Sequence, residues 1–136
     1  MGEAMNFILA GLGKQQTEVL RQLSEFTRQH DYYLAGGTAL SIYFGHRKSI
    51  DLDWFTGESM GDALVLADQI KRAGIPFETE QAARGTLHGM IHKVRVTFLE
   101  FRYPLLEPST ELPPANCRLA SLDDLACMKL SAIAQR

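Results

Sequence analysis

Cysteine and long apolar runs are both scarce in this sequence. Cysteine occurs only twice in 136 residues, at Cys117 and Cys127, and this spacing fits no zinc-ligand pattern. Two thiols without a secretion signal favour a reducing compartment. No apolar stretch is long enough to cross a bilayer, since residues 7–12 fall far short of the required length. We therefore expect a cytoplasmic protein with no membrane partner.

An excess of basic charge is also missing. Fourteen Lys and Arg residues stand against sixteen Asp and Glu residues, which gives a formal net charge of −2. This balance does not indicate a strongly basic nucleic-acid binder. Two local clusters remain, residues 46–48 and the group Arg84, His88, His92, Lys93 and Arg95. Clusters of this size are more often ordinary solvated surface.

Hydrophobic residues, in contrast, make up 46% of the chain. This content suffices for a core without disulfides or a structural metal. The length favours one domain over residues 1–136, with residues 1–16 as an N-terminal extension.

Apolar periodicity and the positions of glycine and proline predict an alternation of helices and strands. Helices are expected over residues 17–30, 38–44, 62–73 and 122–134, and strands over residues 32–35, 50–55, 76–81, 86–92 and 94–101. Turns are expected at residues 84–85 and 92–93. The prolines between residues 103 and 120 predict a long irregular connection. This order is typical of an α+β fold, with a mixed sheet flanked by helices.

Two aspartates in the predicted strand 50–55 are the first candidate for chemistry. Residues two apart in a strand point to the same face, so Asp51 and Asp53 project together, roughly 6.5–7 Å apart. Leu52 and Trp54 would then face the core. Two such carboxylates suit Mg²⁺, which prefers oxygen ligands. The alternative is an edge strand with two solvated aspartates.

A glycine pair just before this strand strengthens the case. Gly36 and Gly37 end a predicted strand and Thr38 opens a predicted helix, so free N–H groups and the positive end of the helix dipole meet there. A triphosphate fits such a terminus because glycine has no Cβ to obstruct the backbone. Arg47 and Ser49 precede the aspartates, and Arg47 has the geometry to clamp a phosphate. The alternative is a tight strand–helix turn and a surface arginine.

These motifs together resemble the AbiEii-type toxin nucleotidyltransferases of bacterial abortive-infection and toxin–antitoxin systems. The resemblance runs from about Tyr32 to the end of the chain and lies in the segments Gly36-Gly-Thr-Ala-Leu40, Arg47-x-Ser49-x-Asp51-x-Asp53, Val94-Arg-Val-Thr-Phe-Leu99, Tyr103-Pro-Leu-Leu106, Leu119-Ala-Ser-Leu-Asp-Asp-Leu125 and Met128-Lys-Leu-Ser-Ala-Ile-Ala-Gln-Arg136.

The resemblance implies a polymerase-β-like nucleotidyltransferase core that uses a nucleoside triphosphate and Mg²⁺. Members of the family transfer a nucleotide to RNA such as tRNA. By position, Gly37 and Thr38 would contact the triphosphate, Asp51 and Asp53 would hold Mg²⁺, and Lys129 would bind phosphates.

The chain departs from the family pattern in two places. Thr97 stands where the family usually has a third aspartate, and a hydroxyl is neither a general base nor an anionic metal ligand. Glu100 lies nearby but is expected to point to the opposite face of its strand. The family also continues into a helical half after the Lys129 helix, so the sequence resembles a truncated member.

Three hypotheses follow. The chain is an active nucleotidyltransferase, a nucleotide-binding remnant without transfer activity, or an interaction module that binds a cognate antitoxin or a second copy of itself. Thr97 favours the second hypothesis over the first, and the glycine–aspartate segment favours both over the third.

Overall fold

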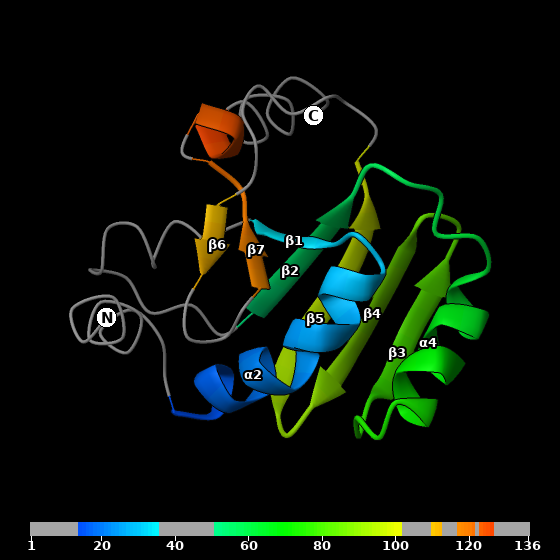
Figure 1. The fold of residues 1–136 in the computed structure, drawn as a ribbon. Coiled ribbons are helices and arrows are strands. Elements are labelled where there is room, and N and C mark those ends of the chain that lie inside the picture. The colour runs from blue at the N-terminus through cyan, green and yellow to red at the C-terminus, as the bar shows by residue number, and fades with distance from the viewer. Residues whose placement is uncertain (1–13, 36–50, 102–109, 113–116, 122, 127–136) are drawn as a thin grey trace.

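The computed structural model describes residues 14–35, 51–101, 110–112, 117–121 and 123–126. Its centre is a seven-stranded sheet with the strand order β3-β4-β5-β2-β1-β7-β6 (Figure 1). The strands are β1 (Tyr33–Ala35), β2 (Asp51–Thr56), β3 (Glu78–Ala83), β4 (Thr86–Ile91), β5 (Val94–Glu100), β6 (Thr110–Leu112) and β7 (Cys117–Leu119). The predicted turn at residues 36–37 and the predicted helix 38–44 lie outside the described residues.

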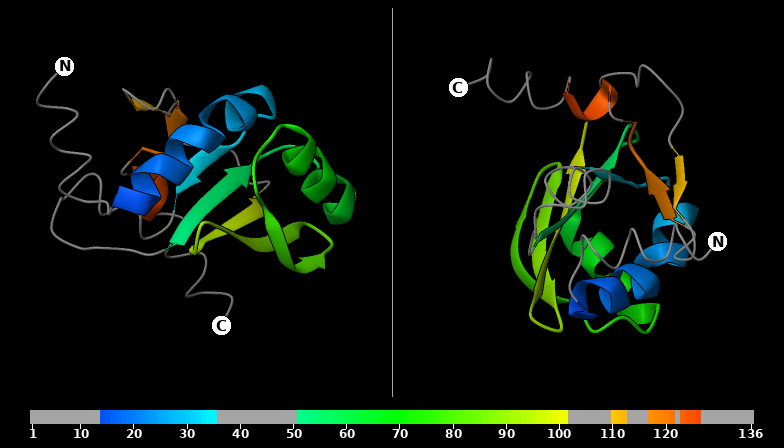
Figure 2. Two further views of the ribbon diagram at one scale, coloured as in Figure 1. Left: turned by 90° about the horizontal axis from the view of Figure 1, so that it is seen from below. Right: turned by 90° about the vertical axis from the view of Figure 1, so that its left-hand side faces the viewer.

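The sheet is mixed, as the sequence predicted. β2 is parallel to β5 and β1 is parallel to β7, whereas the other neighbouring pairs are antiparallel. Helices α2 (Lys14–Gln29) and α4 (Ala63–Arg72) both lie on one face of the sheet (Figures 1 and 2). We call this the helix face and the opposite one the distal face.

The hydrophobic core lies between the sheet and the two helices. Strand β2 alternates half-buried and buried residues along its length, and Leu52 and Trp54 are fully buried. They belong to one core cluster with Leu20 and Leu23 of α2 and Ile70 of α4. This confirms the expectation that Leu52 and Trp54 anchor the strand.

Both described helices match their predictions. α2 begins at Lys14, so the first turn extends into the expected N-terminal extension, and Gln16 is already buried there. α4 begins after Asp62, whose carboxylate accepts a hydrogen bond from the Leu64 N–H at 2.9 Å. Neither helix is long and apolar enough to cross a membrane.

Strands β3, β4 and β5 form the meander that the turn signals predicted. His92 and Lys93 both have positive φ, at 49° and 68°, as a two-residue hairpin turn requires. This turn sets Ile91 opposite Val94 and thereby fixes the register of the whole β4–β5 pair. The register decides which side chains of β4 reach the candidate site.

The predicted irregular connection over residues 103–120 is wrong for two segments. β6 and β7 pair with each other, and β7 also pairs with β1 through Leu34 and Leu119. Each strand has only three residues, and the sequence between them holds Pro113 and Pro114. Such short segments carry too little alternation to be recognised as strands, and the pairing of β7 with β1 joins residues that are distant in sequence.

The start of the last predicted helix is confirmed. The Asp124 N–H donates to the Ser121 hydroxyl at 3.1 Å, and this hydroxyl donates to the Asp124 carboxylate at 2.8 Å. Residues 123–126 are helical. Ser121 therefore caps this helix.

Candidate functional site

Asp51 and Asp53 lie on the distal face of the sheet. Both are half-buried, whereas Leu52 and Trp54, which alternate with them along β2, are fully buried on the helix face. The predicted projection of both carboxylates from one face is therefore confirmed. The described strand begins at Asp51, so the pair occupies its first half.

Strand pairing places three more residues in one row with Asp53. Ala35 is its partner on β1 and Thr97 its partner on β5, and Thr97 in turn faces His88 on β4. Paired residues of neighbouring strands share a face of the sheet, about 4.8 Å apart. The row on the distal face is thus Ala35, Asp53, Thr97 and His88. Ala35, which directly precedes Gly36 in the sequence, thus lies beside Asp53.

The electrostatic state of Asp53 is unusual for an aspartate. Burial, the largest cause, and the negative charge of Asp51 raise its pKa from 3.8 to about 6, although His88 acts in the opposite direction. A carboxylate that is desolvated and repelled by its neighbour is stabilised by a nearby cation. The pair therefore favours occupation by a positive ion.

The donor set fits a magnesium ion that shares its ligands with a substrate. Among the described residues, no group of three or more His, Cys, Asp or Glu side chains is placed to hold a metal. Mg²⁺ is commonly bound by only one or two carboxylates together with substrate phosphates. Asp51 and Asp53 meet this requirement, and the site has no all-protein cage among these residues.

Thr97 is engaged by a histidine that the sequence did not identify as a site residue. His88 Nδ1 lies 3.0 Å from the Thr97 hydroxyl oxygen, within hydrogen-bond distance. Thr97 is buried and His88 is half-buried. The two-residue turn at His92 and Lys93 was the signal that would have revealed the contact. This turn pairs Ile91 with Val94, and the antiparallel register that follows from this pair sets His88 opposite Thr97.

Glu100 does not substitute for the missing third carboxylate. Its carboxylate accepts a hydrogen bond from the Met60 N–H at 2.6 Å, at the far end of β5. It is the register partner of Thr56 rather than of Asp53. The expectation that Glu100 points away from Thr97 agrees with this contact.

Aromatic rings line the next row of the distal face. Tyr33 of β1 is the register partner of Phe55, and the two ring centroids are 6.2 Å apart. Phe55 in turn meets Phe101 edge-on at 5.8 Å. This apolar row lies next to Asp53 along β2, and burial is the largest cause of the raised pKa of that carboxyl.

Six other predicted site residues lie outside the described part of the chain. They are Gly36, Gly37, Thr38, Arg47, Ser49 and Lys129. The roles assigned to them therefore remain predictions.

The second basic cluster considered from the sequence is not one patch. Arg84 lies at one end of β4 and His92 and Lys93 lie at the other, about 20 Å apart for a six-residue strand. Arg95 is instead the register partner of Asp51. An exposed cation thus stands beside the carboxylate pair, on the same face of the sheet.

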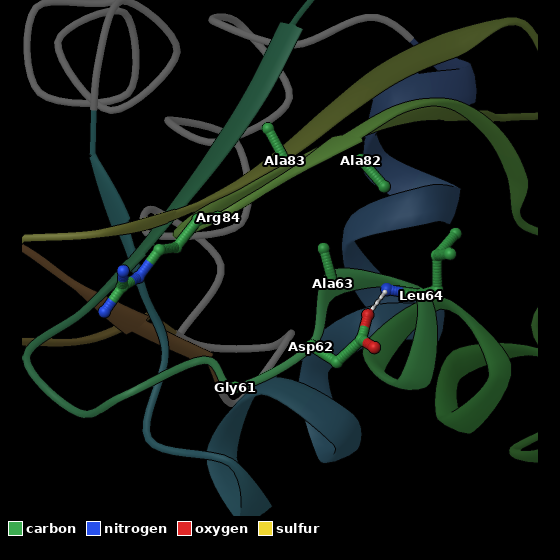
Figure 3. Close-up of a pocket in the computed structure, with 7 residues that line it drawn as sticks. All are labelled: Gly61, Asp62, Ala63, Leu64, Ala82, Ala83 and Arg84. Atoms are coloured by element: carbon green, nitrogen blue, oxygen red, sulfur yellow. Dashed lines mark hydrogen bonds between the residues drawn. The ribbon is translucent and has the colours of Figure 1, made fainter.

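A separate pocket lies between the start of α4 and the end of β3, with a volume of about 400 Å³ (Figure 3). Its lining residues are Gly61, Asp62, Ala63, Leu64, Ala82, Ala83 and Arg84. Asp62 is already engaged there in capping α4. Neither carboxylate of the candidate site lines this pocket, and we assign no function to it.

The mixed sheet and the paired carboxylates on β2 are features expected of a nucleotidyltransferase core. In agreement, residues 18–136 match the family described as "Nucleotidyl transferase AbiEii toxin, Type IV TA system". The match spans most of the chain, and the protein belongs to this AbiEii family.

A curated relative extends the comparison. An uncharacterised protein of Aquifex aeolicus (strain VF5) is 39% identical over 126 residues. The alignment covers 92% of this chain and 61% of the relative. The chain thus spans about three fifths of the length of this relative.

Solved structures with the same fold are tRNA-processing enzymes. A CCA-adding enzyme in its apo form I has a TM-score of 0.59 at 17% identity, covering 92% of this chain and 34% of that one. The CCA-adding enzyme of Thermotoga maritima complexed with tRNA has a TM-score of 0.54 at 19% identity, covering 71% and 23%. At these identities the likeness shows the fold, which resembles the nucleotidyltransferase domain of CCA-adding enzymes.

Proposed function

We propose that this protein is a Mg²⁺-dependent nucleotidyltransferase that moves a nucleotide from a nucleoside triphosphate to an RNA acceptor and acts as a toxin. The observation that carries the proposal is the placement of Asp51 and Asp53 together on the distal face, beside the end of β1. The raised pKa of Asp53 supports it, because the pair is destabilised until a cation neutralises it.

In this mechanism the protein mainly positions charges. Asp51 and Asp53 would hold Mg²⁺, and Gly36, Gly37 and Thr38 would bind the triphosphate through backbone N–H groups and a hydroxyl. When bound, Mg²⁺ would supply positive charge next to the phosphates.

Three further residues complete the proposed phosphate site: Arg47, Ser49 and Lys129. Their side chains would donate hydrogen bonds or neutralise charge on the phosphates. Arg95, beside Asp51, adds positive charge at the outer edge of the site.

The acceptor and partner follow from the relatives. The structural neighbour from Thermotoga maritima is complexed with tRNA, which supports tRNA as the acceptor class. The family description includes a toxin–antitoxin system, which supports a cognate antitoxin as the protein partner. We place this activity in the cytoplasm, where both the triphosphate and the tRNA are found.

Thr97 favours a second candidate function. With a hydroxyl beside Asp53 in place of a carboxylate, the protein would bind a nucleoside triphosphate and Mg²⁺ without transferring the nucleotide. The remaining candidate, a module that binds an antitoxin or a second copy of the chain, would need neither ligand.

Ligand-dependent thermal unfolding tests the binding part of the proposal. At a concentration 100 times the Kd, a nucleoside triphosphate with Mg²⁺ should stabilise the protein by about 2.7 kcal/mol. Asp51→Asn should abolish this shift, whereas Asp68→Asn, at an exposed position on α4, should retain it. A protein that none of the four triphosphates stabilises would leave only the interaction module.

Label transfer tests the reaction. Each α-³²P-labelled triphosphate is incubated with the protein, Mg²⁺ and total RNA, and labelled RNA is resolved by size. We expect label in the tRNA fraction from one triphosphate in preference to the others, and none with Asp53→Asn. Binding without any transfer would establish the nucleotide-binding remnant instead.

A further inference from the structure

The reaction proposed above leaves one chemical requirement unassigned. When an acceptor hydroxyl attacks the α-phosphorus, its oxygen forms a new O–P bond and its proton must leave. The bond from the α-phosphorus to the bridging oxygen breaks, and that electron pair leaves with pyrophosphate. Asp51 and Asp53 are committed to the metal, so another group must accept the proton.

The row on the distal face supplies a chain of two groups for this proton. Thr97 is the register neighbour of Asp53, and its hydroxyl oxygen lies 3.0 Å from His88 Nδ1. A hydroxyl alone does not accept a proton at neutral pH, but a hydroxyl that donates to an imidazole nitrogen gives up its own proton as it receives another. The pair therefore has the elements of a relay.

A direct metal role for His88 does not fit this geometry. β5 lies between β2 and β4 in the sheet, so the backbones of His88 and Asp53 are two strand spacings apart, roughly 9.6 Å. Among the described residues, His88 forms no group of three with Asp51 and Asp53 that could hold one metal ion. His88 thus contributes through Thr97.

We propose that Thr97 and His88 form a proton relay for nucleotide transfer. The acceptor hydroxyl gives its proton to Thr97 Oγ1 while Thr97 gives its own proton to His88 Nδ1. The resulting imidazolium later returns the proton to solvent. This inference rests on the proposed transferase function, and Thr97, which replaces the expected aspartate, becomes a working part of the site.

The surroundings of His88 are compatible with a transient positive charge. Gln81 is its register partner on β3 and is neutral, and Thr86 and Met90, which share its face of β4, carry no charge. The charged groups on the same face are Arg95 of β5, Glu78 of β3 and the carboxylates of β2, and Glu80 stands at the register irregularity of β3 next to Gln81. Positive charge on His88 lowers the pKa of Asp53 and so favours its carboxylate form.

Steady-state kinetics of His88→Asn in the full chain test the relay. Asparagine keeps a hydrogen-bonding atom near the position of Nδ1 but takes no proton. We expect kcat to fall about 100-fold, the usual range for loss of a general base. KM for the triphosphate and its Mg²⁺-dependent thermal shift should stay within about threefold, since no phosphate contact is lost.

Two further variants separate a relay from a structural role. His92→Gln, at the exposed turn of the same hairpin, should leave kcat unchanged. The double variant Thr97→Asp with His88→Asn should have a kcat at least tenfold higher than that of His88→Asn alone, because a carboxylate accepts the proton directly. The ¹⁵N shifts of His88 provide a readout independent of turnover, and we expect an unprotonated Nδ1 in the resting protein.

The outcomes distinguish the two proposals. Wild-type kcat in His88→Asn, or a protonated Nδ1 in the neutral ring, would overturn the relay while leaving the transferase function intact. A wild-type protein that binds Mg²⁺ and triphosphate but transfers no label would overturn both transfer and relay and leave only binding.

Discussion

The two faces of strand β2 differ sharply in what they contribute. On the helix face, Leu52 and Trp54 are fully buried among apolar side chains. On the distal face, Asp51 and Asp53 are half-buried, and burial with mutual repulsion raises the pKa of Asp53. Six residues thus build part of the core on one side and a charged site on the other.

This difference teaches that stability and function are divided by side-chain alternation rather than by position along the chain. Residues on the helix face gain free energy by leaving water. Residues on the distal face lose free energy until a ligand arrives, since partly buried carboxylates of like charge repel. Substitutions on the two faces should therefore change unfolding free energy in opposite directions.

The largest expected effect is on the helix face. Trp54→Ala should lower the unfolding free energy by about 3–5 kcal/mol, because it removes a fully buried indole from the core. Urea denaturation in EDTA measures it. Asp51→Asn, three residues away on the same strand but on the distal face, is the matched control and should not destabilise. Equal losses of unfolding free energy in the two variants would show that the two faces contribute alike to stability.

A smaller effect of opposite sign is expected for Asp53→Asn. The folded pKa of about 6 exceeds the ordinary 3.8, so the folded state holds its proton more tightly than the unfolded state. Wild-type stability is then fully present below pH ~4 and falls as the pH rises through 6. Asparagine does not ionise, so Asp53→Asn does not lose unfolding free energy as the pH rises. We expect it to be about 1–2 kcal/mol more stable than the wild type at pH 8, after allowing for the solvent exposure of the group.

Denaturant unfolding in EDTA at pH 4, 5, 6 and 8 measures this difference. The two proteins should be equally stable at pH 4 and diverge above it, and the variant should lose the stabilisation by Mg²⁺ and triphosphate. A pH-independent difference would mean that the charge of Asp53 is not its cause.

Much of the fold could be predicted because its signals are local. The alternation in Asp51–Thr56, the cap at Asp62 and the turn at His92 and Lys93 each act within a few residues. Strands β6 and β7 could not be predicted, because three residues carry no clear period and the pairing that joins them to the sheet, between Leu119 and Leu34, is distant in sequence. Strand formation there is decided by tertiary contacts.

The candidate site shows the same limit. The same-face placement of Asp51 and Asp53 follows from one strand alone, so the sequence sufficed. The contact between His88 and Thr97 depends on the register of two strands, and the link from Thr97 to Asp53 depends on a parallel pairing across more than forty residues. No local pattern specifies that β2 lies beside β5.

The smallest expected effect extends the comparison to β1. Tyr33 is buried on the distal face beside Phe55, and burial, the larger cause, and the negative charge of Asp124 together raise the pKa of its hydroxyl to about 12. Within the described residues its hydroxyl has no hydrogen-bond partner. Because a buried, unpaired hydroxyl costs free energy and phenylalanine keeps the ring, Tyr33→Phe should raise the unfolding free energy by about 0.5–1 kcal/mol. Urea denaturation measures it, with Tyr32→Phe on the opposite side of the chain as the comparison. A lower unfolding free energy in Tyr33→Phe would mean that this hydroxyl makes a hydrogen bond in the folded protein. On the distal face, only the carboxylates would then lower the stability.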